Sequence, residues 1–301
     1  MNKKLIVAVS LGVFSQVGTA DEVNMNSLIY QCNQQNKLHD SSKALELSAQ
    51  ILKLDANNSG GLMCKGRALG ELNKTAEAIT VLDQAAKYAS SDFDKLSIAT
   101  MQGSILKNAQ QYDAAIAKYN IALAMSKEAQ LNRFERIEHN MLGDTYSLTN
   151  AQEKALENYL LGNKLSANDA ERADNLTKIA AMYASLGKKT QAIETQLQAV
   201  VAHDNTHDLD NMAESKLTLG QYYTANMDFK LAEQFINKTI KMAQEQGGAY
   251  WEARGYYTLA LTKLAAQQQA EAKALLIQAK KLSDSLGEKE LSDDISKALN
   301  S

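Results

Sequence analysis

The sequence predicts an all-α protein made of repeated pairs of helices, and three observations support that prediction. Proline is absent from all 301 residues, which suits a helical chain because a proline inside a helix costs about 3 kcal/mol. Small and apolar residues recur three and four positions apart, the spacing that gathers side chains on one face of a helix. The third observation is that one such pattern returns along the chain at a nearly constant interval.

The pattern is clearest between residues 213 and 242, which we expect to form two helices that meet through small residues. One face of the first helix carries Leu219, Gly220 and Tyr223, and one face of the second carries Ala232, Ile236 and Thr239. Helices that pack about 8 to 10 Å apart need Gly or Ala where their axes cross. The two faces are therefore predicted to interlock.

An alanine near the start of each second helix marks the repeat. It occurs at Ala44, Ala78, Ala115, Ala155, Ala192, Ala232 and Ala272. The first interval is 34 residues, and the later intervals of 37 and 40 add three or six residues. These additions correspond to roughly one or two helical turns. The sequence therefore predicts seven helical pairs.

This pattern resembles the tetratricopeptide (TPR) repeat, whose signature is W-x2-L-G-x2-Y followed by A-x3-F. Leu219-Gly220, Tyr223 and Ala232 meet it, while Lys216 and Ile236 replace the usual aromatic residues. The longer intervals resemble the extended repeats of bacterial regulators and sensors. The chain departs from the family where a proline usually follows the second helix, so its helix ends must rely on Asn, Asp and Gly.

The resemblance implies a right-handed TPR-like solenoid over residues 21–301, with about seven repeats. The first helices of the pairs would line a concave surface that binds a protein or peptide. The tail, residues 287–301, keeps Leu291, Ile295 and Leu299 on one face and acidic residues on the other. We expect it to form a capping helix, because an open end would expose the last apolar seam.

The first 20 residues read as a secretory signal peptide. A short cationic start is followed by an apolar run from Leu5 to Phe14 and by small residues at Gly18 and Ala20. The run is about half of the ~20 residues needed to span a bilayer, which disfavours the alternative of a membrane anchor. The leader predicts a periplasmic or secreted bacterial protein, cleaved near Ala20, with no membrane span in the mature chain.

The charge balance predicts a protein partner and no nucleic acid. The net charge is −3, and removing Lys3 and Lys4 with the leader leaves 30 basic side chains against 35 acidic ones, or −5. Binding to phosphates needs clustered Lys and Arg, which the chain lacks. The sequence also contains no nucleophile motif, glycine-rich phosphate loop or paired catalytic carboxylates. We therefore expect a protein that is not an enzyme and uses no cofactor.

By the resemblance, the partner surface consists of first-helix residues that point away from the packing face. The expected residues are Asn33, Arg67, Ser104, Asn140, Asp144, Leu217, Gln221, Tyr250, Trp251, Arg254, Tyr257 and Leu261. The preferred contact is the last-repeat stripe from Tyr250 to Leu261, because aromatic and Arg residues are enriched at binding hot spots. The alternative is that these rings fill the seam with the preceding repeat, as we expect for Tyr223 and Tyr256.

Two other modes of action stay open at this stage. The stripe with Trp251 and Tyr257 could instead bind a small ligand or an oligosaccharide of the cell envelope, and the array could associate with itself through its ends. Capture of an acidic chaperone tail is disfavoured, because only Asn33 agrees with the carboxylate clamp that this function needs within the family.

Cys32 and Cys64 are the two cysteines of the chain, one on each of two successive first helices. A disulfide between them is compatible with an oxidising compartment, and two buried reduced thiols are the alternative.

His203 and His207 share the segment HDNTHDLD with three aspartates. This segment could bind a metal in principle, but polar runs between repeats usually cap helices, so no metal site is predicted.

Overall fold

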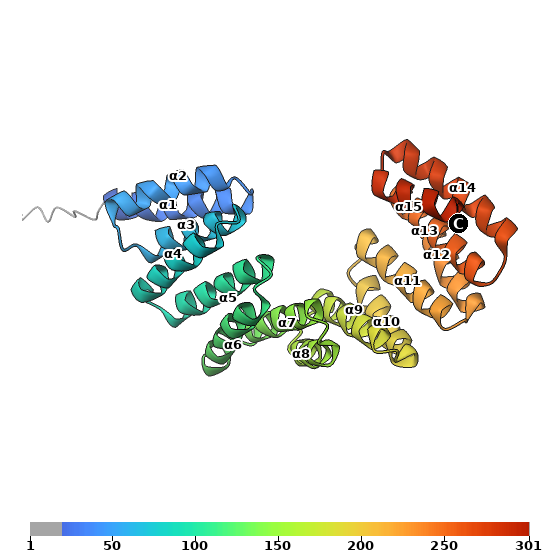
Figure 1. The fold of residues 1–301 in the computed structure, drawn as a ribbon, viewed down its shortest axis with the longest axis horizontal. Coiled ribbons are helices and arrows are strands. Elements are labelled where there is room, and N and C mark those ends of the chain that lie inside the picture. The colour runs from blue at the N-terminus through green and yellow to red at the C-terminus, as the bar shows by residue number, and fades with distance from the viewer. Residues whose placement is uncertain (1–19, 301) are drawn as a thin grey trace, which may run out of the picture. The chain divides into compact units, whose positions relative to one another are not determined.

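The computed structural model describes residues 20–300, with side chains from Met25 onward. Over this range the chain forms fifteen helices and no strand (Figure 1). The helices are α1 (Ala20–Lys37), α2 (Ser41–Leu54), α3 (Ser59–Glu71), α4 (Thr75–Tyr88), α5 (Asp92–Asn108), α6 (Tyr112–Glu128), α7 (Asn132–Leu148), α8 (Gln152–Lys164), α9 (Asp169–Ser185), α10 (Lys189–Asp204), α11 (Leu209–Ala225), α12 (Phe229–Gln246), α13 (Ala249–Ala265), α14 (Gln269–Leu286) and α15 (Lys289–Leu299). The predicted leader lies outside the described residues, except for Ala20. Among residues 20–300, no helix combines the length and apolarity that crossing a bilayer requires.

The helices group into two compact units, one ending at Gln110 and the other beginning at Gln111. The first unit contains α1 to α5, and the second contains α6 to α15. Within the units, the members of the predicted pairs α1/α2, α3/α4, α7/α8, α9/α10, α11/α12 and α13/α14 contact each other. The helices of the third predicted pair, α5 and α6, belong to different units. A single solenoid domain over residues 21–301 stays a prediction.

The repeat alanines are buried at every predicted position. Ala192 is 1% exposed, and the other six alanines of the series are 0% exposed. Such burial is what the alignment requires, because each alanine was assigned to the face on which its helix meets a neighbour. The register of the repeat inferred from sequence is therefore confirmed.

Glycines in the first helices allow close contact with bulky residues of the second helices. A Cβ atom added to Gly220 of α11 would lie 2.6 Å from Ile236 Cγ1 of α12. One added to Gly143 of α7 would lie 2.5 Å from Tyr159 Cε1 of α8. Both distances are far below van der Waals contact, so a larger residue at either position must push the helices apart.

Most of the short turns between helices contain one residue in the left-handed conformation. Gly187, Gly247 and Gly287 supply it at three turns, with φ between 72° and 76°. At Gly187 the helix ends in a Schellman motif, in which Lys188 N–H donates to Tyr183 O at 2.9 Å. Asn, Asp and Gly were predicted at helix ends, but other residues also occupy the left-handed position: His39, Gln110, Gln130, His207, Met227 and Gln267.

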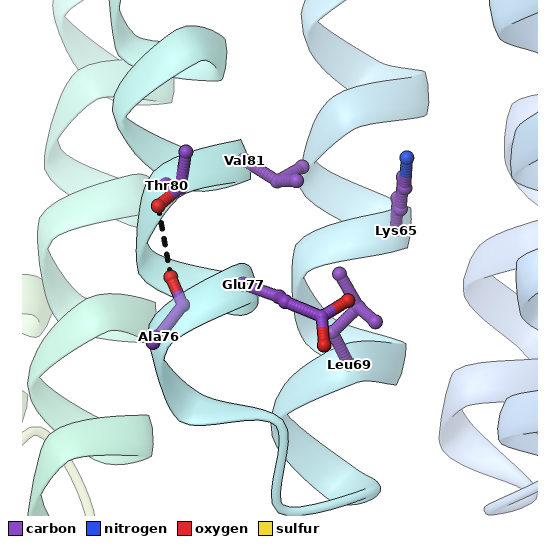
Figure 2. A pocket seen from close by; sticks show the side chains of 6 residues that line it. All are labelled: Lys65, Leu69, Ala76, Glu77, Thr80 and Val81. Atoms are coloured by element: carbon purple, nitrogen blue, oxygen red, sulfur yellow. Dashed lines mark hydrogen bonds between the residues drawn. The ribbon is translucent and has the colours of Figure 1, made fainter.

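In the first unit, α3 and α4 border a cavity of about 350 Å³. Lys65 and Leu69 line it from α3, and Glu77, Thr80 and Val81 line it from α4 (Figure 2). The hydroxyl of Thr80 donates to Ala76 O of its own helix at 2.9 Å. None of the predicted site residues lies in this cavity.

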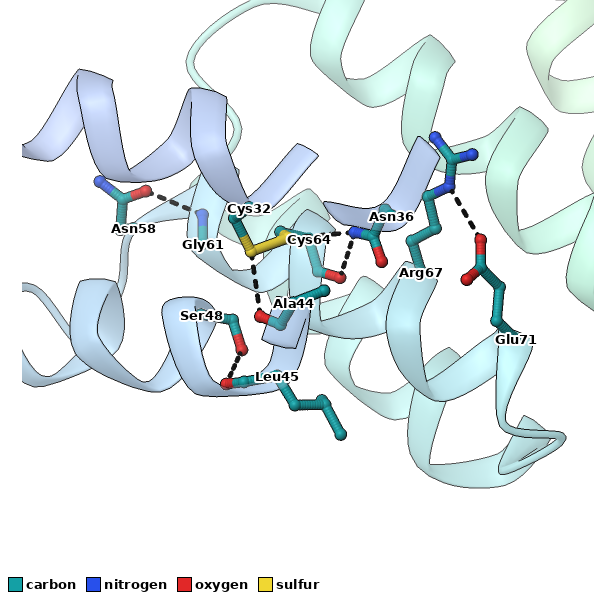
Figure 3. Close-up of a disulfide and its surroundings, with 10 residues drawn as sticks. All are labelled: Cys32, Asn36, Ala44, Leu45, Ser48, Asn58, Gly61, Cys64, Arg67 and Glu71. Carbon is teal, nitrogen blue, oxygen red and sulfur yellow. Dashed lines mark hydrogen bonds and ion pairs between the residues drawn. A yellow bond between two sulfur atoms is a disulfide. The ribbon is translucent and has the colours of Figure 1, made fainter. Parts of the chain in front are cut away.

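A disulfide joins Cys32 of α1 to Cys64 of α3, whose Cα atoms are 6.2 Å apart (Figure 3). Both cysteines belong to an apolar cluster with Ala44, Leu47, Ile51 and Ala68. Asn36 reinforces the link between the helices, because its Nδ2 donates to Cys64 O at 3.0 Å. Two successive first helices are thus connected covalently.

The tail folds as α15 and covers the apolar end of the last pair. Ile295 is 0% exposed and lies in a cluster with Ala260 of α13 and with Leu276 and Ala279 of α14. Leu291 and Leu299 pack against the same cluster. The left-handed turn at Gly287 returns the chain so that α15 lies against α14.

We predict that Gly220→Leu destabilises the protein by about 1 to 3 kcal/mol, because the new side chain would overlap Ile236. Chemical denaturation followed by circular dichroism measures the change. Gln221→Leu at the next, exposed position is the control and should shift the free energy of unfolding by less than about 0.5 kcal/mol. Equal stability of the two variants would contradict the close approach.

We predict that opening the disulfide lowers the stability of the first unit by about 3 to 4 kcal/mol, through the entropy that a loop of this length returns to the unfolded chain. Thermal melts with and without reductant measure the effect. The double variant Cys32→Ala, Cys64→Ala should melt like the reduced protein and should not respond to reductant. A parent protein that melts identically in both conditions would count against the bridge.

Candidate functional site

Two cavities lie along the first helices of the second unit. The first, which we name the histidine cavity, has a volume of about 280 Å³ and lies among α7, α9, α10 and α11. The second, the tyrosine cavity, has a volume of about 230 Å³ and lies among α11, α13 and the α14–α15 end of the chain. We call the surface formed by α7, α9, α11 and α13 the first-helix surface.

The tyrosine cavity unites four of the residues predicted from sequence. Tyr250, Arg254 and Tyr257 line it from α13, and Gln221 lines it from α11. Positions four and seven residues apart share one face of a helix, which explains why the three α13 side chains point to the same space. Three acidic residues at the start of α15 and within it also line the cavity, and none of them was predicted as a site residue: Glu288, Glu290 and Asp294.

Arg254 lies beside two aromatic rings. Its guanidinium carbon lies 5.9 Å from the ring centroid of Tyr250 and 5.5 Å from that of Trp251. The two rings meet edge to face, with centroids 5.1 Å apart. Contact with both rings restrains the long side chain, so Arg254 presents its charge to the cavity at a reduced entropic cost.

Tyr257 contributes a phenol that stays protonated. Its burial raises its pKa above the usual tyrosine value, and the negative charge of Asp294 raises it further, while Lys297 acts in the opposite direction. The hydroxyl can therefore donate one hydrogen bond and accept others at neutral pH.

Two of the predicted partner-binding residues belong to the core instead. Trp251 is 7% exposed, and its Nε1–H donates to Asp210 Oδ1 at 2.5 Å. Leu217 is 2% exposed, and both residues belong to the apolar cluster centred on α11, α12 and α13. The first helices are packed on more than one side, so an apolar residue that points away from one helix can still face another. Trp251 has the burial that the alternative of filling the seam requires.

Asp144 connects three helices. Its Oδ1 accepts from Tyr159 Oη of α8 at 2.7 Å and from Lys178 Nζ of α9 at 2.8 Å. Lys178 also lies over the Tyr159 ring, with Nζ 5.4 Å from the centroid. Burial and the Asp144 charge raise the pKa of Tyr159 far above its usual value. Asp144, predicted as a partner contact, thus has a structural role in holding successive pairs together.

The remaining predicted residues are distributed over both units. In the second unit, Leu261 is 37% exposed on α13, and Asn140 of α7 lines the histidine cavity. In the first unit, Asn33 is exposed on α1. Arg67 lines a cavity of about 310 Å³ with Ser104, and its Nε lies 3.5 Å from Glu71 Oε1.

The segment from His203 to Asp210 caps helices. His203 is 6% exposed at the end of α10, whereas His207 is an exposed residue of the turn with a φ of 56°. Asp208 accepts from Asn211 N–H at 2.9 Å and so caps α11. Among the described residues, no group of three or more His, Cys, Asp or Glu side chains could hold a metal ion.

No protein-family model matches the chain, and no curated protein matches its sequence. Solved structures with a similar fold do exist. The apo form of RapI is 12% identical with a TM-score of 0.73, over 90% of this chain and 80% of RapI. The C-terminal part of a TPR repeat-containing protein from Cytophaga hutchinsonii is 14% identical with a TM-score of 0.65, over 85% of this chain and 95% of that one.

A third similar structure contains TPR-like repeats of a putative kinesin light chain from Podosopora anserina. It is 16% identical with a TM-score of 0.57, over 64% of this chain and 97% of that one. At such identities the likeness concerns the fold alone. It confirms the predicted class of an all-α array of helical repeats.

We predict that Tyr159→Phe lowers the free energy of unfolding by about 1 to 2 kcal/mol at pH 7, because a buried hydrogen bond to Asp144 is lost. The difference from the parent should shrink above pH 10. A raised folded-state pKa stabilises the protein below the unfolded value of about 10, and this stabilisation falls by about 1.4 kcal/mol per pH unit above it.

Denaturant unfolding at pH 8 and pH 11 measures this difference. Tyr88→Phe at an exposed position is the matched control and should leave the stability at pH 8 unchanged. A constant difference between the parent and Tyr159→Phe at both pH values would contradict the assignment.

Proposed function

We propose that this chain, which has the fold of tetratricopeptide repeat proteins, is a non-enzymatic adaptor or scaffold that binds a protein or peptide on its first-helix surface. The observation that carries the proposal is the tyrosine cavity, in which Tyr250, Arg254 and Tyr257 converge with Gln221. Tyr and Arg are the residue types most often found at the energetic centre of protein interfaces. A pocket that combines restrained Tyr and Arg side chains supports recognition of a protein surface.

The charges around the tyrosine cavity favour a partner segment that carries positive charge. Glu288, Glu290 and Asp294 line one side, and Arg254 is the single basic residue among the lining residues. An excess of carboxylates attracts Lys or Arg side chains and repels acidic segments. This polarity agrees with the disfavoured capture of acidic chaperone tails.

The burial of Trp251 argues against the alternative of an oligosaccharide receptor. Such a receptor would stack sugar rings on an exposed indole, but the Trp251 side chain is in the core and its N–H is bound to Asp210. Self-association through the C-terminal end is likewise weakened, because α15 covers the apolar cluster there. The adaptor function is therefore preferred over both.

We also propose that the protein is exported to the periplasm or beyond, where it serves assembly or secretion at the cell envelope. Two features support an oxidising compartment. One is the leader pattern of residues 1–20, and the other is the disulfide between Cys32 and Cys64.

A photo-crosslinking residue tests the proposed contact. Placed at Gln221, on the rim of the tyrosine cavity, it should capture one defined partner when the full chain is expressed in its native host. Placed at Lys281, an exposed position of α14 outside the cavity, it should not. The captured partner, once purified, should bind Arg254→Ala about thirtyfold more weakly than the parent, which corresponds to a hot-spot loss of about 2 kcal/mol.

Lys281→Ala is the matched control for Arg254→Ala and should bind like the parent. Capture from Lys281 with the same yield as from Gln221, or unchanged affinity of Arg254→Ala, would refute the tyrosine cavity as the contact. Circular dichroism of each variant verifies that a loss of binding does not reflect a loss of fold.

A further inference from the structure

The histidine cavity and the tyrosine cavity are connected across α11, which contributes residues to both linings. Asn211, Glu214 and Thr218 line the histidine cavity, and Gln221 lines the tyrosine cavity. Steps of three, four and three residues place these four side chains on one face of the helix. Three of them are exposed, and Thr218 is half-buried. We call these four residues the α11 strip, a polar path that leads from one cavity to the other.

Both linings contain more acidic than basic side chains. The acidic residues are Asp174 and Glu214 in the histidine cavity, and Glu288, Glu290 and Asp294 in the tyrosine cavity. Each lining contains a single Lys or Arg residue. Lys178 of the histidine cavity is bound to Asp144 at 2.8 Å, and Arg254 of the tyrosine cavity lies beside two aromatic rings.

Most of these carboxylates are not neutralised within the chain. Asp294 pairs with Lys297 at 2.9 Å. The other four acids of the two linings have no ion-pair partner among residues 25–300. An excess of unpaired carboxylates attracts cationic side chains of a partner and repels anionic ones. Each cavity is therefore suited to a Lys or Arg side chain.

The distance between the cavities determines how two such cations must be spaced. Glu214 and Gln221 are seven residues apart, which is about 10 Å along a helix axis. The path between the cavities is longer, because Glu214 faces the cavity shared with α9 and Gln221 the cavity shared with α13. In an extended peptide, alternate side chains lie on one side, and a step of four residues covers about 13 Å. A step of two residues covers only about 7 Å.

We propose that the first-helix surface binds an extended partner segment with two cationic side chains four residues apart, one in each cavity. Asp174 and Glu214 receive one cation, and Glu288 and Glu290 receive the other. The hydroxyl and amide groups of the α11 strip meet the main chain between the two cations, whose N–H and C=O groups are unpaired in an extended segment. This inference rests on the proposed function, because it adds the histidine cavity to the contact already assigned to the tyrosine cavity.

Two peptides of identical composition and charge test the spacing. Acetyl-Arg-Thr-Ser-Thr-Arg-amide carries its arginines four residues apart, and acetyl-Arg-Arg-Thr-Ser-Thr-amide carries them side by side. Calorimetric titration into the full mature chain at low ionic strength should show about tenfold tighter binding of the spaced peptide, because its second cation binds as an intramolecular event. Equal affinities of the two peptides, or no binding of the spaced one, would overturn the proposal.

Decamethylenediamine tests whether the α11 strip contacts a main chain. It carries two cations at a similar separation and has no peptide groups. It should bind more weakly than the spaced peptide, because it cannot form hydrogen bonds with the strip. Binding as tight as that of the spaced peptide would assign the surface to a free polyamine and would contradict a peptide partner.

Single substitutions test whether both cavities contribute. Glu214→Gln and Glu290→Gln should each weaken binding of the spaced peptide about fivefold through the loss of one exposed ion pair. Each should weaken the side-by-side peptide by less than about twofold, because that peptide can occupy the other cavity. Glu157→Gln removes the same charge from an exposed position of α8 and should leave both affinities unchanged.

Circular dichroism verifies that the variants remain folded. Equal effects of Glu214→Gln and Glu157→Gln on the spaced peptide would refute a contribution of the histidine cavity.

A second photo-crosslinking position separates this inference from the proposed function. Asn211 is exposed and lines the histidine cavity. A photo-crosslinking residue at this position should capture the same partner that is captured from Gln221. Capture from Gln221 alone would overturn the contact with two cavities and leave the adaptor function standing. Capture from neither position would refute both.

Discussion

The close approach of two helices within each pair is the constraint on which the rest of the structure depends. Gly143 against Tyr159 and Gly220 against Ile236 show the same arrangement, a small residue of the first helix beneath a large residue of the second. Because glycine and alanine consume so little space, one narrow face of each first helix suffices for the contact within its pair. Other faces remain to meet neighbouring pairs and to line cavities, and the two candidate sites of the second unit occupy such faces.

Hydrogen bonds and an ion pair between side chains also connect the helices, in addition to the packing of small residues. Tyr159, Asp144 and Lys178 connect α7, α8 and α9, while Trp251 reaches from α13 to Asp210 of α11. Both contacts span successive repeats, where side-chain shape alone would tolerate some sliding. Their geometry restrains the spacing of the first helices, and side chains of these helices line both cavities. The proposed recognition would therefore depend on side-chain contacts between helices as well as on the residues of the cavity itself.

The repeat could be predicted from sequence because its signal is steric and local. Each of the seven alanines was predicted to lie on the face where its helix meets a neighbour, and all seven are buried. The burial of Leu217 and Trp251 could not be predicted in the same way, because helical spacing shows which residues share a face but not how many neighbours cover it. The acids of α15 were missed as cavity residues since only the turn at Gly287 brings them opposite Tyr250. His203 was considered only as part of a polar turn segment, whereas its burial at the end of α10 depends on contacts that a sequence does not contain.

The first and last pairs are secured by different chemistry, with a covalent bond near the amino terminus and a single apolar helix at the carboxyl terminus. Terminal repeats have one neighbour fewer than internal ones, so local opening tends to begin there. Fraying should accordingly favour α15, whose departure would remove one wall of the tyrosine cavity. A ligand that binds α13 and α15 at once would hold α15 in place. Binding in the tyrosine cavity would then protect the C-terminal segment from proteases.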